Sequence, residues 1–167
     1  DAAIAVWNEM TPVADDTLFA ECRTIYNLTN TEGIEKYDEC AQWVADYKAG
    51  KIPSDSYTMA ERAFCYRVAA LRDQPLFRPI PLTVIGVGGV VFVGFGGEAF
   101  TSYGQKMRDL CPDKFVVSAV CANGYEGYLP TAEAFAQGGY EACSSFFMPT
   151  LEDEIVTAAR EMLEKLK

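Results

Sequence analysis

The chain has 167 residues, enough for one domain with a sizeable core. Half of the residues are hydrophobic and 13% are aromatic, which excludes a disordered chain. The 24 acidic residues outnumber the 14 basic ones, and the net charge of −10 argues against nucleic acid or an anionic membrane as the partner. Histidine is absent, so most hydrolytic machinery cannot be complete within this chain.

The first half of the sequence, residues 1–79, is predicted to be mainly helical. The first of its helices would place four residues on one face: Leu18, Cys22, Ile25 and Thr29. The same spacing over 34–44 predicts a second helix, which Gly50 and Pro53 end. A third helix is predicted over about 56–72, and the prolines that follow it at 75, 79 and 81 favour an extended link.

Residues 80–97 carry no charged side chain and reach the length of a membrane span. Their glycines, prolines and alternating valines disfavour a helix and instead predict a buried β-hairpin. Its strands would be 82–87 and 90–95, and Gly88-Gly89 would supply the positive φ that a tight turn requires.

The rest of the second half predicts a β-α-β unit and a final helix. A helix over about 98–110 precedes a strand over 114–121, and a short helix begins near Thr131. Residues 150–153 have the pattern of a capping box. The helix that follows would bury Leu151, Ile155, Ala159, Met162 and Leu166. The predicted fold class is α/β: a helical first half, then a β-hairpin plus β-α-β forming part of a mixed sheet, and a carboxyl-terminal helix.

Three predicted strands make a narrow sheet for so much apolar sequence. We therefore expect an upstream part of the same polypeptide, or a partner, to cover the sheet or one of its edges. Without that cover the chain would self-associate.

The six cysteines show no CxxC spacing. They are interpreted as buried free thiols, although an even number also allows disulfides in a secreted chain. Free thiols favour a reducing compartment such as the cytoplasm, but the localisation stays open. The start of the sequence contains no segment like a signal peptide. Asn27-Leu28-Thr29 fits a glycosylation sequon, which we interpret as chance because it lies in a helical pattern.

The glycines between 86 and 97 do not form a nucleotide-binding loop. A GxGxxG motif beginning at Gly86 would need glycine at 91, where Val91 stands, and no Walker lysine follows Gly94. The glycines are better interpreted as serving the hairpin turn and a close approach of two backbones.

Glu98 follows this glycine-rich run at the carboxyl end of a strand. It is either a first-turn acid that interacts with the helix dipole or a functional group, such as a metal ligand or base, at a sheet edge. The loop 122–128 follows the next strand, so parallel strands would bring this loop and Glu98 to one edge. Tyr125, Tyr128 and Tyr140 are either packing aromatics or site residues.

Three motifs in order decide between these alternatives. They are Gly96-Gly97-Glu98-Ala99-Phe100-Thr101 with the helix segment Gly104-Gln105-Lys106-Met107-Arg108, then Asn123-Gly124-Tyr125-Glu126-Gly127-Tyr128-Leu129-Pro130-Thr131, and finally Tyr140-Glu141-Ala142-Cys143-Ser144. Over residues 84–148 this arrangement resembles the neutral/alkaline (non-lysosomal) ceramidase family. The chain looks like the carboxyl-terminal portion of a short, bacterial-type relative. Gly96 departs from the family's usual proline.

The resemblance implies roles for particular residues. In the family the matching glutamate and second loop tyrosine are zinc ligands, which implies Glu98 and Tyr128 as metal ligands. Tyr140 matches a tyrosine that assists at the scissile amide. Asn123 and Tyr125, from the same loop, are candidates for substrate binding. The family's histidine ligands, catalytic serine and arginine lie upstream, and nothing in this chain matches them.

The sequence therefore predicts part of a ceramidase-like zinc amidohydrolase that acts on an N-acyl lipid. Residues 80–167 would be its zinc-site half, and this chain alone would be inactive. The alternative is a non-catalytic partner- or ligand-binding domain that keeps the fold.

Overall fold

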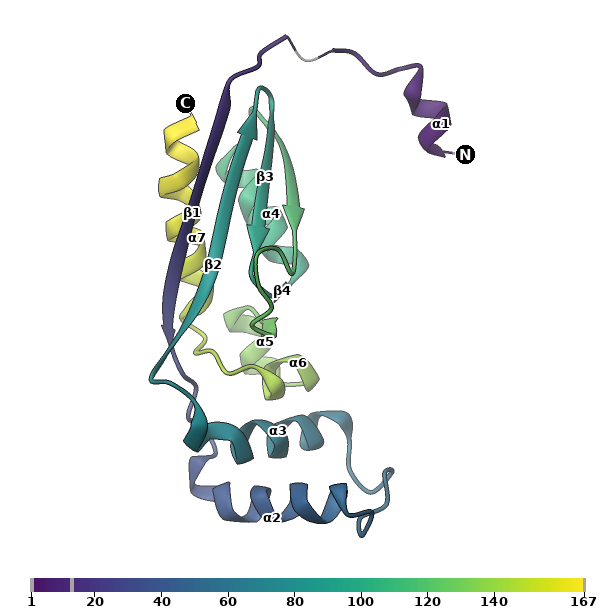
Figure 1. Ribbon diagram of the computed structural model, residues 1–167, viewed down its shortest axis with the longest axis vertical. Coiled ribbons are helices and arrows are strands. Elements are labelled where there is room, and N and C mark those ends of the chain that lie inside the picture. The colour runs from purple at the N-terminus through teal and green to yellow at the C-terminus, as the bar shows by residue number, and fades with distance from the viewer. Residues whose placement is uncertain (1, 13, 167) are drawn as a thin grey trace.

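The computed structural model describes residues 2–12 and 14–166 (Figure 1). The strands of its main sheet are β1 (Leu18–Leu28), β2 (Phe77–Val87), β3 (Val90–Phe95) and β5 (Phe115–Ala119), in the spatial order β1-β2-β3-β5. β1 and β3 both pair antiparallel with β2, whereas β5 pairs parallel with β3. The chain is thus an α/β protein with a mixed sheet, as predicted.

Helices lie on one face of this sheet and at one of its ends. α4 (Thr101–Leu110) and α7 (Leu151–Leu163) pack on one face, while α2 (Tyr37–Lys48) and α3 (Met59–Ala70) form a helical pair between β1 and β2 in the chain. The short helices are α1 (Ala2–Trp7), α5 (Ala132–Gln137), α6 (Tyr140–Ser144) and the 3-10 helices η1 (Ile34–Lys36), η2 (Leu71–Asp73) and η3 (Glu164–Leu166). In Figure 1, α3 lies between α2 and α6 below the sheet.

The predicted first helix is wrong, because Leu18–Leu28 forms β1. Its residues pair with β2 along the whole strand, from Leu18 opposite Val87 to Leu28 opposite Phe77. Exposure alternates along β1, and its inward positions include the polar Glu21 and Arg23. Glu21 forms an ion pair with Lys165 in η3 at 2.7 Å, and Arg23 forms one with Glu161 in α7 at 2.6 Å. Because the inward face is partly polar, the hydrophobic residues of β1 do not mark its buried side. The main sheet therefore has β1 as a fourth strand, in addition to the three that the sequence predicts.

The β-hairpin is confirmed, with β2 longer than predicted. Gly88 has a φ of 55° in the turn, as a tight turn requires. The expected extended link is part of β2: Pro79 and Pro81 pair with β1 at positions where β2 has no partner in β3, whose pairing begins at Leu82. None of the helices in the described residues is long and apolar enough to cross a membrane.

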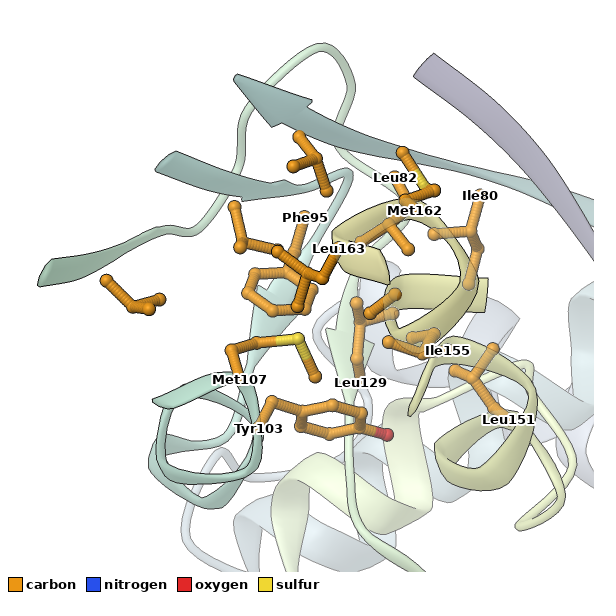
Figure 2. Packing of buried hydrophobic residues seen from close by; sticks show 14 of the residues in the cluster. Ile80, Leu82, Phe95, Tyr103, Met107, Leu129, Leu151, Ile155, Met162 and Leu163 are labelled. Carbon is orange, nitrogen blue, oxygen red and sulfur yellow. The ribbon is translucent and has the colours of Figure 1, made fainter. Parts of the chain in front are cut away.

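The core lies between the sheet and the helices α4 and α7 (Figure 2). β2, β3 and β5 contribute aliphatic or aromatic side chains from their inward faces. α7 buries Leu151, Ile155, Ala159 and Met162 as predicted, whereas Leu166 lies beyond α7, in η3, and is only partly buried. The most buried large side chains of this core include Ile80, Leu82, Phe95, Tyr103, Met107, Leu129, Leu151, Ile155 and Met162. Burying one such side chain contributes about 1.5–3 kcal/mol to stability, so this layer fixes the position of everything attached to the sheet.

The predicted capping box at Thr150 does not form, although α7 begins at Leu151 as expected. The Thr150 hydroxyl makes no cap bond and instead accepts from Nδ2 of Asn27 at 3.0 Å. Nδ2 also donates to Glu154, and Oδ1 accepts from the Met148 amide. Asn27 is 1% exposed and lies in a strand rather than a helix, so its amide ties β1 to α7 and is inaccessible to glycosylation.

All six cysteines are free, but they are not all buried. Cys40 is buried between α2 and α3, whereas Cys22 and Cys121 are exposed. The prediction of buried thiols is therefore wrong for the latter two, and Cys65, Cys111 and Cys143 are only partly buried.

Cys65 should resist alkylation. Burial, reinforced by the neighbouring Cys40, raises the pKa of the Cys65 thiol to about 12. Because the thiolate is the nucleophile, raising the pKa removes the reactive form at every pH well below 12. Peptide mapping by mass spectrometry after a short iodoacetamide treatment at pH 8 should show modification of Cys22 and Cys121 and almost none of Cys65. Equal labelling of all three would contradict this.

Candidate active site

Two short strands bring Glu98 and Tyr128 together. β4 (Glu98–Ala99) and β6 (Tyr128–Leu129) pair in parallel, with Glu98 opposite Tyr128. β4 directly follows β3, and β6 follows the loop that leaves β5 (Figure 1). Since β3 and β5 are parallel neighbours, both residues lie at the same edge, beyond the carboxyl ends of these strands. Glu98 is thus a strand residue rather than a first-turn residue of α4, which begins only at Thr101.

The pairing depends on a close approach of two backbones at Gly97. The Glu98 amide donates to the Gly127 carbonyl at 2.8 Å, and the Glu126 amide donates to the Gly96 carbonyl at 2.8 Å. A Cβ atom at position 97 would lie 2.6 Å from the Gly127 carbonyl oxygen. The glycine at 97 therefore permits the backbone contact that sets Glu98 beside Tyr128.

Substitution Gly97→Ala should destabilise the chain by about 1–3 kcal/mol, the usual cost of forcing extra volume into a packed site. Gly89→Ala is the matched control, because a Cβ atom at position 89 meets nothing within 4 Å. Urea unfolding of both variants measures the difference. Equal free energies of unfolding would show that β4 and β6 can separate without cost.

The Glu98 carboxylate lies beside two tyrosines of the loop, Tyr125 and Tyr128, and is hydrogen-bonded to the first. The Tyr125 hydroxyl donates to Oε1 of Glu98 at 2.6 Å, and this bond to the carboxylate raises the pKa of Tyr125 to about 12. Partial burial, followed by the charge of Glu98, raises the pKa of Tyr128. Tyr125 is itself 63% exposed. The carboxylate thus lies in contact with one phenol and close to a second, at an edge that solvent reaches.

Tyr140 joins this group from α6. Gly138 and Gly139 precede it with φ values of 78° and 106°, a backbone that residues with a Cβ atom rarely adopt. The ring of Tyr140 meets the ring of Tyr128 edge-to-face, with 5.7 Å between centroids. The three site residues that the resemblance implies therefore lie together, although β4, β6 and α6 are separate in the sequence.

Asn123 holds the loop rather than pointing freely into the site. It adopts a positive φ of 63°, which asparagine tolerates better than most residues, and its Nδ2 donates to Oγ1 of Thr83 at 2.8 Å. The loop has a second anchor in Arg78, which forms an ion pair with Glu126 at 3.0 Å and stacks on Phe146. Arg78 and Thr83 could not be predicted as anchors of the loop. Their partners Glu126 and Asn123 lie 48 and 40 residues away in the sequence, and no motif links them.

Within the described residues, no group of three or more His, Cys, Asp or Glu side chains is placed to hold a metal ion. The oxygen atoms that come together at this edge are those of the Glu98 carboxylate, the Tyr125 hydroxyl that donates to it, and the Tyr128 phenol on the opposing strand, and of these the resemblance implies Glu98 and Tyr128 as metal ligands. A metal ion here would take at least one further ligand from elsewhere, since catalytic zinc usually has three protein ligands.

The known proteins to which this chain is similar include neutral ceramidases. No known protein-family profile matches the chain. Neutral ceramidase A of Dictyostelium discoideum is 33% identical over 78 residues, which cover 42% of this chain and 11% of that protein. The resemblance to the neutral ceramidases is confirmed. The matched segment is nevertheless a small part of that relative's length.

The solved structure of neutral ceramidase from Pseudomonas aeruginosa shares the fold. It aligns with 90% of this chain and 28% of its own, with a TM-score of 0.53 and 13% identity. Another solved structure, a ceramidase complexed with C2, aligns with 55% of this chain and 15% of its own at a TM-score of 0.48 and 20% identity. The first of these alignments shows that the architecture is that of part of a neutral ceramidase.

Proposed function

We propose that this chain forms the carboxyl-terminal part of a ceramidase-like zinc amidohydrolase that cleaves the amide bond of an N-acyl lipid. The observation that carries this proposal is the register of β4 and β6, which sets Glu98 opposite Tyr128. These are the residues that match the family's ligand motifs, and they lie far apart in the sequence. The 78-residue similarity to neutral ceramidase A supports the same reading.

The donor set fits zinc in part. Glu98 supplies a carboxylate, a regular zinc ligand, and Tyr128 supplies a phenol oxygen from the opposing strand. Both would hold the ion, together with ligands from polypeptide outside this chain. When bound, zinc would polarise the amide carbonyl and lower the pKa of a water molecule. The chain's own task would be to present two oxygen donors at a fixed separation.

Tyr140 and Tyr125 would act on either side of the ligands. Tyr140 packs edge-to-face on Tyr128, and it would donate a hydrogen bond to an oxyanion that develops at the amide carbonyl. The Tyr125 hydroxyl holds the Glu98 carboxylate and could exchange this bond for one to the substrate. Asn123 orients the loop through Thr83, so its contribution to substrate binding would be indirect.

The isolated chain of 167 residues should bind zinc weakly and hydrolyse no N-acyl lipid. We expect this because the chain offers two candidate ligands, fewer than the three protein ligands that catalytic zinc requires. Isothermal titration with zinc and a fluorescent N-acyl sphingosine assay measure both properties. Tight, stoichiometric zinc uptake would reveal a ligand that the present assignment lacks.

The complete polypeptide that contains this chain provides the complementary test. Zinc-dependent hydrolysis of the same N-acyl sphingosine would support the proposal. If the complete polypeptide, supplied with zinc, leaves the amide intact, the alternative of a non-catalytic binding domain with this fold is correct.

A further inference from the structure

A cavity of about 460 Å³ is lined by residues of α2, α3 and α6 and by Phe146. This volume falls in the range of small-molecule sites, about 300–1,000 Å³. Met59, Tyr66 and Phe146 contribute much of its apolar wall, and Tyr47, Arg62 and Arg67 contribute polar groups. Tyr140 also lines the cavity, so the cavity adjoins the candidate active site.

Arg62 presents a half-buried guanidinium group to this cavity. Its Nη1 donates to the Tyr47 hydroxyl at 3.2 Å, a bond that links α3 to α2. Within the part of the chain that the structure describes, Arg62 has no carboxylate within ion-pair distance. Most of the donors of this side chain therefore remain free for a ligand.

Arg67 adds a second positive charge, five residues further along α3. It is 3% exposed and donates to the backbone carbonyls of Cys143, Asn30 and Glu32, at 2.9, 3.1 and 3.1 Å. Burial lowers its pKa, but an arginine side chain remains protonated in proteins. No carboxylate of a described residue forms an ion pair with it. Its charge is thus stabilised at contact distance by neutral carbonyls and by the Phe64 ring, whose centroid lies 5.5 Å from the guanidinium carbon, while the Glu32 charge acts on it without forming an ion pair.

The charge of the cavity contrasts with that of the whole chain. The chain carries a net charge of −10, yet neither aspartate nor glutamate is among the described residues that line the cavity. A buried cation without a counter-ion is costly, and an anion that enters beside it recovers part of that cost. The aromatic and aliphatic wall would in turn exclude water from an alkyl chain.

We propose that this cavity binds a single-chain amphiphile with a carboxylate head, held at Arg62 and attracted by Arg67, with its alkyl chain against Met59, Tyr66 and Phe146. The planar guanidinium group suits a carboxylate because it can donate two parallel hydrogen bonds. The volume accommodates one alkyl chain more readily than the two of a phospholipid. This binding does not depend on the proposed hydrolase activity, although an occupant would contact Tyr140.

Decanoate and its neutral isostere decanamide are the probes for this site. Isothermal titration of the 167-residue chain below the micellar concentration should show that decanoate binds more tightly than decanamide or acetate. Added NaCl should weaken decanoate binding and leave decanamide binding unchanged. The substitution Arg62→Gln should weaken decanoate binding by about tenfold or more, the effect of losing a charge-assisted hydrogen bond.

Arg108→Gln is the matched control, because Arg108 is exposed on α4 and donates only to Gln105 among the described side chains. It removes the same charge without touching the cavity, and decanoate affinity should remain unchanged. Arg62→Lys should recover part of the affinity, since it keeps the charge and loses the planar fork. Circular dichroism checks that each variant is folded. Equal binding of decanoate and decanamide, equal losses in Arg62→Gln and Arg108→Gln, or no binding of decanoate would each overturn the proposal.

Discussion

Substituting Glu98 by Gln in the complete polypeptide should lower kcat/KM for N-acyl lipid hydrolysis by at least about 100-fold. Loss of a residue that merely orients a metal ligand typically costs 10–100-fold, and Glu98 is proposed to bind the ion itself. Glutamine keeps the size of the side chain and an oxygen that can accept from Tyr125, so β4 and β6 should stay paired. Steady-state kinetics at saturating zinc, with the zinc content of the purified protein, measure the effect.

Tyr125→Phe is the control for this experiment. It removes the 2.6 Å hydrogen bond to Glu98 and leaves the carboxylate and its charge in place. Because Tyr125 is largely exposed, the change should cost little stability and reduce activity far less than Glu98→Gln. Activity and zinc content unchanged in Glu98→Gln would exclude Glu98 as a ligand.

The elements that the sequence predicted correctly are those with a strong local signal. The hairpin around Gly88 has both a turn residue and alternating valines, and α7 has its hydrophobic residues at helical spacing. β1 lacks such a signal, because Glu21 and Arg23 occupy its inward face and pair with residues of η3 and α7. Its strand character comes from pairing with β2, an interaction of residues far apart in the sequence.

For the candidate site, too, local sequence motifs predicted some residues, whereas other contacts could be found only in the structure. Glu98, Tyr128 and Tyr140 could be found from ordered motifs, since each motif is local. The bond between Tyr125 and Glu98 and the anchoring of the loop by Arg78 required the structure, because both depend on how β2, β4 and the loop are placed in space. The cavity beside Tyr140 could not be predicted either, as its wall combines α2, α3 and α6.

Among the described residues no helix covers the second face of the main sheet, and the loop after β5 covers only the part near Thr83 and Gly94. α4 and α7 lie on the opposite face, behind the strands in Figure 1. The outward positions carry large apolar side chains: Ile85 is 37% exposed, Phe92 41% and Phe115 71%. An apolar area shared by several strands is typical of an interface. We propose that the upstream part of the longer polypeptide covers it, since this chain spans only 28% of the solved Pseudomonas relative.

The isolated chain should therefore self-associate through this face, and Phe92→Lys should weaken the association by at least about tenfold. Phe92 lies in β3 between β2 and β5, opposite Ile85 and Val117, so a lysine there must be desolvated when two sheets meet. Light scattering over a concentration series measures the dissociation constant. Leu76→Lys is the matched control, because Leu76 is 70% exposed and precedes β2 outside the sheet. A wild-type chain that stays monomeric at every concentration, or equal effects of the two lysines, would show that this face needs no cover. The proposed dependence on an upstream segment would then rest on the sequence similarity alone.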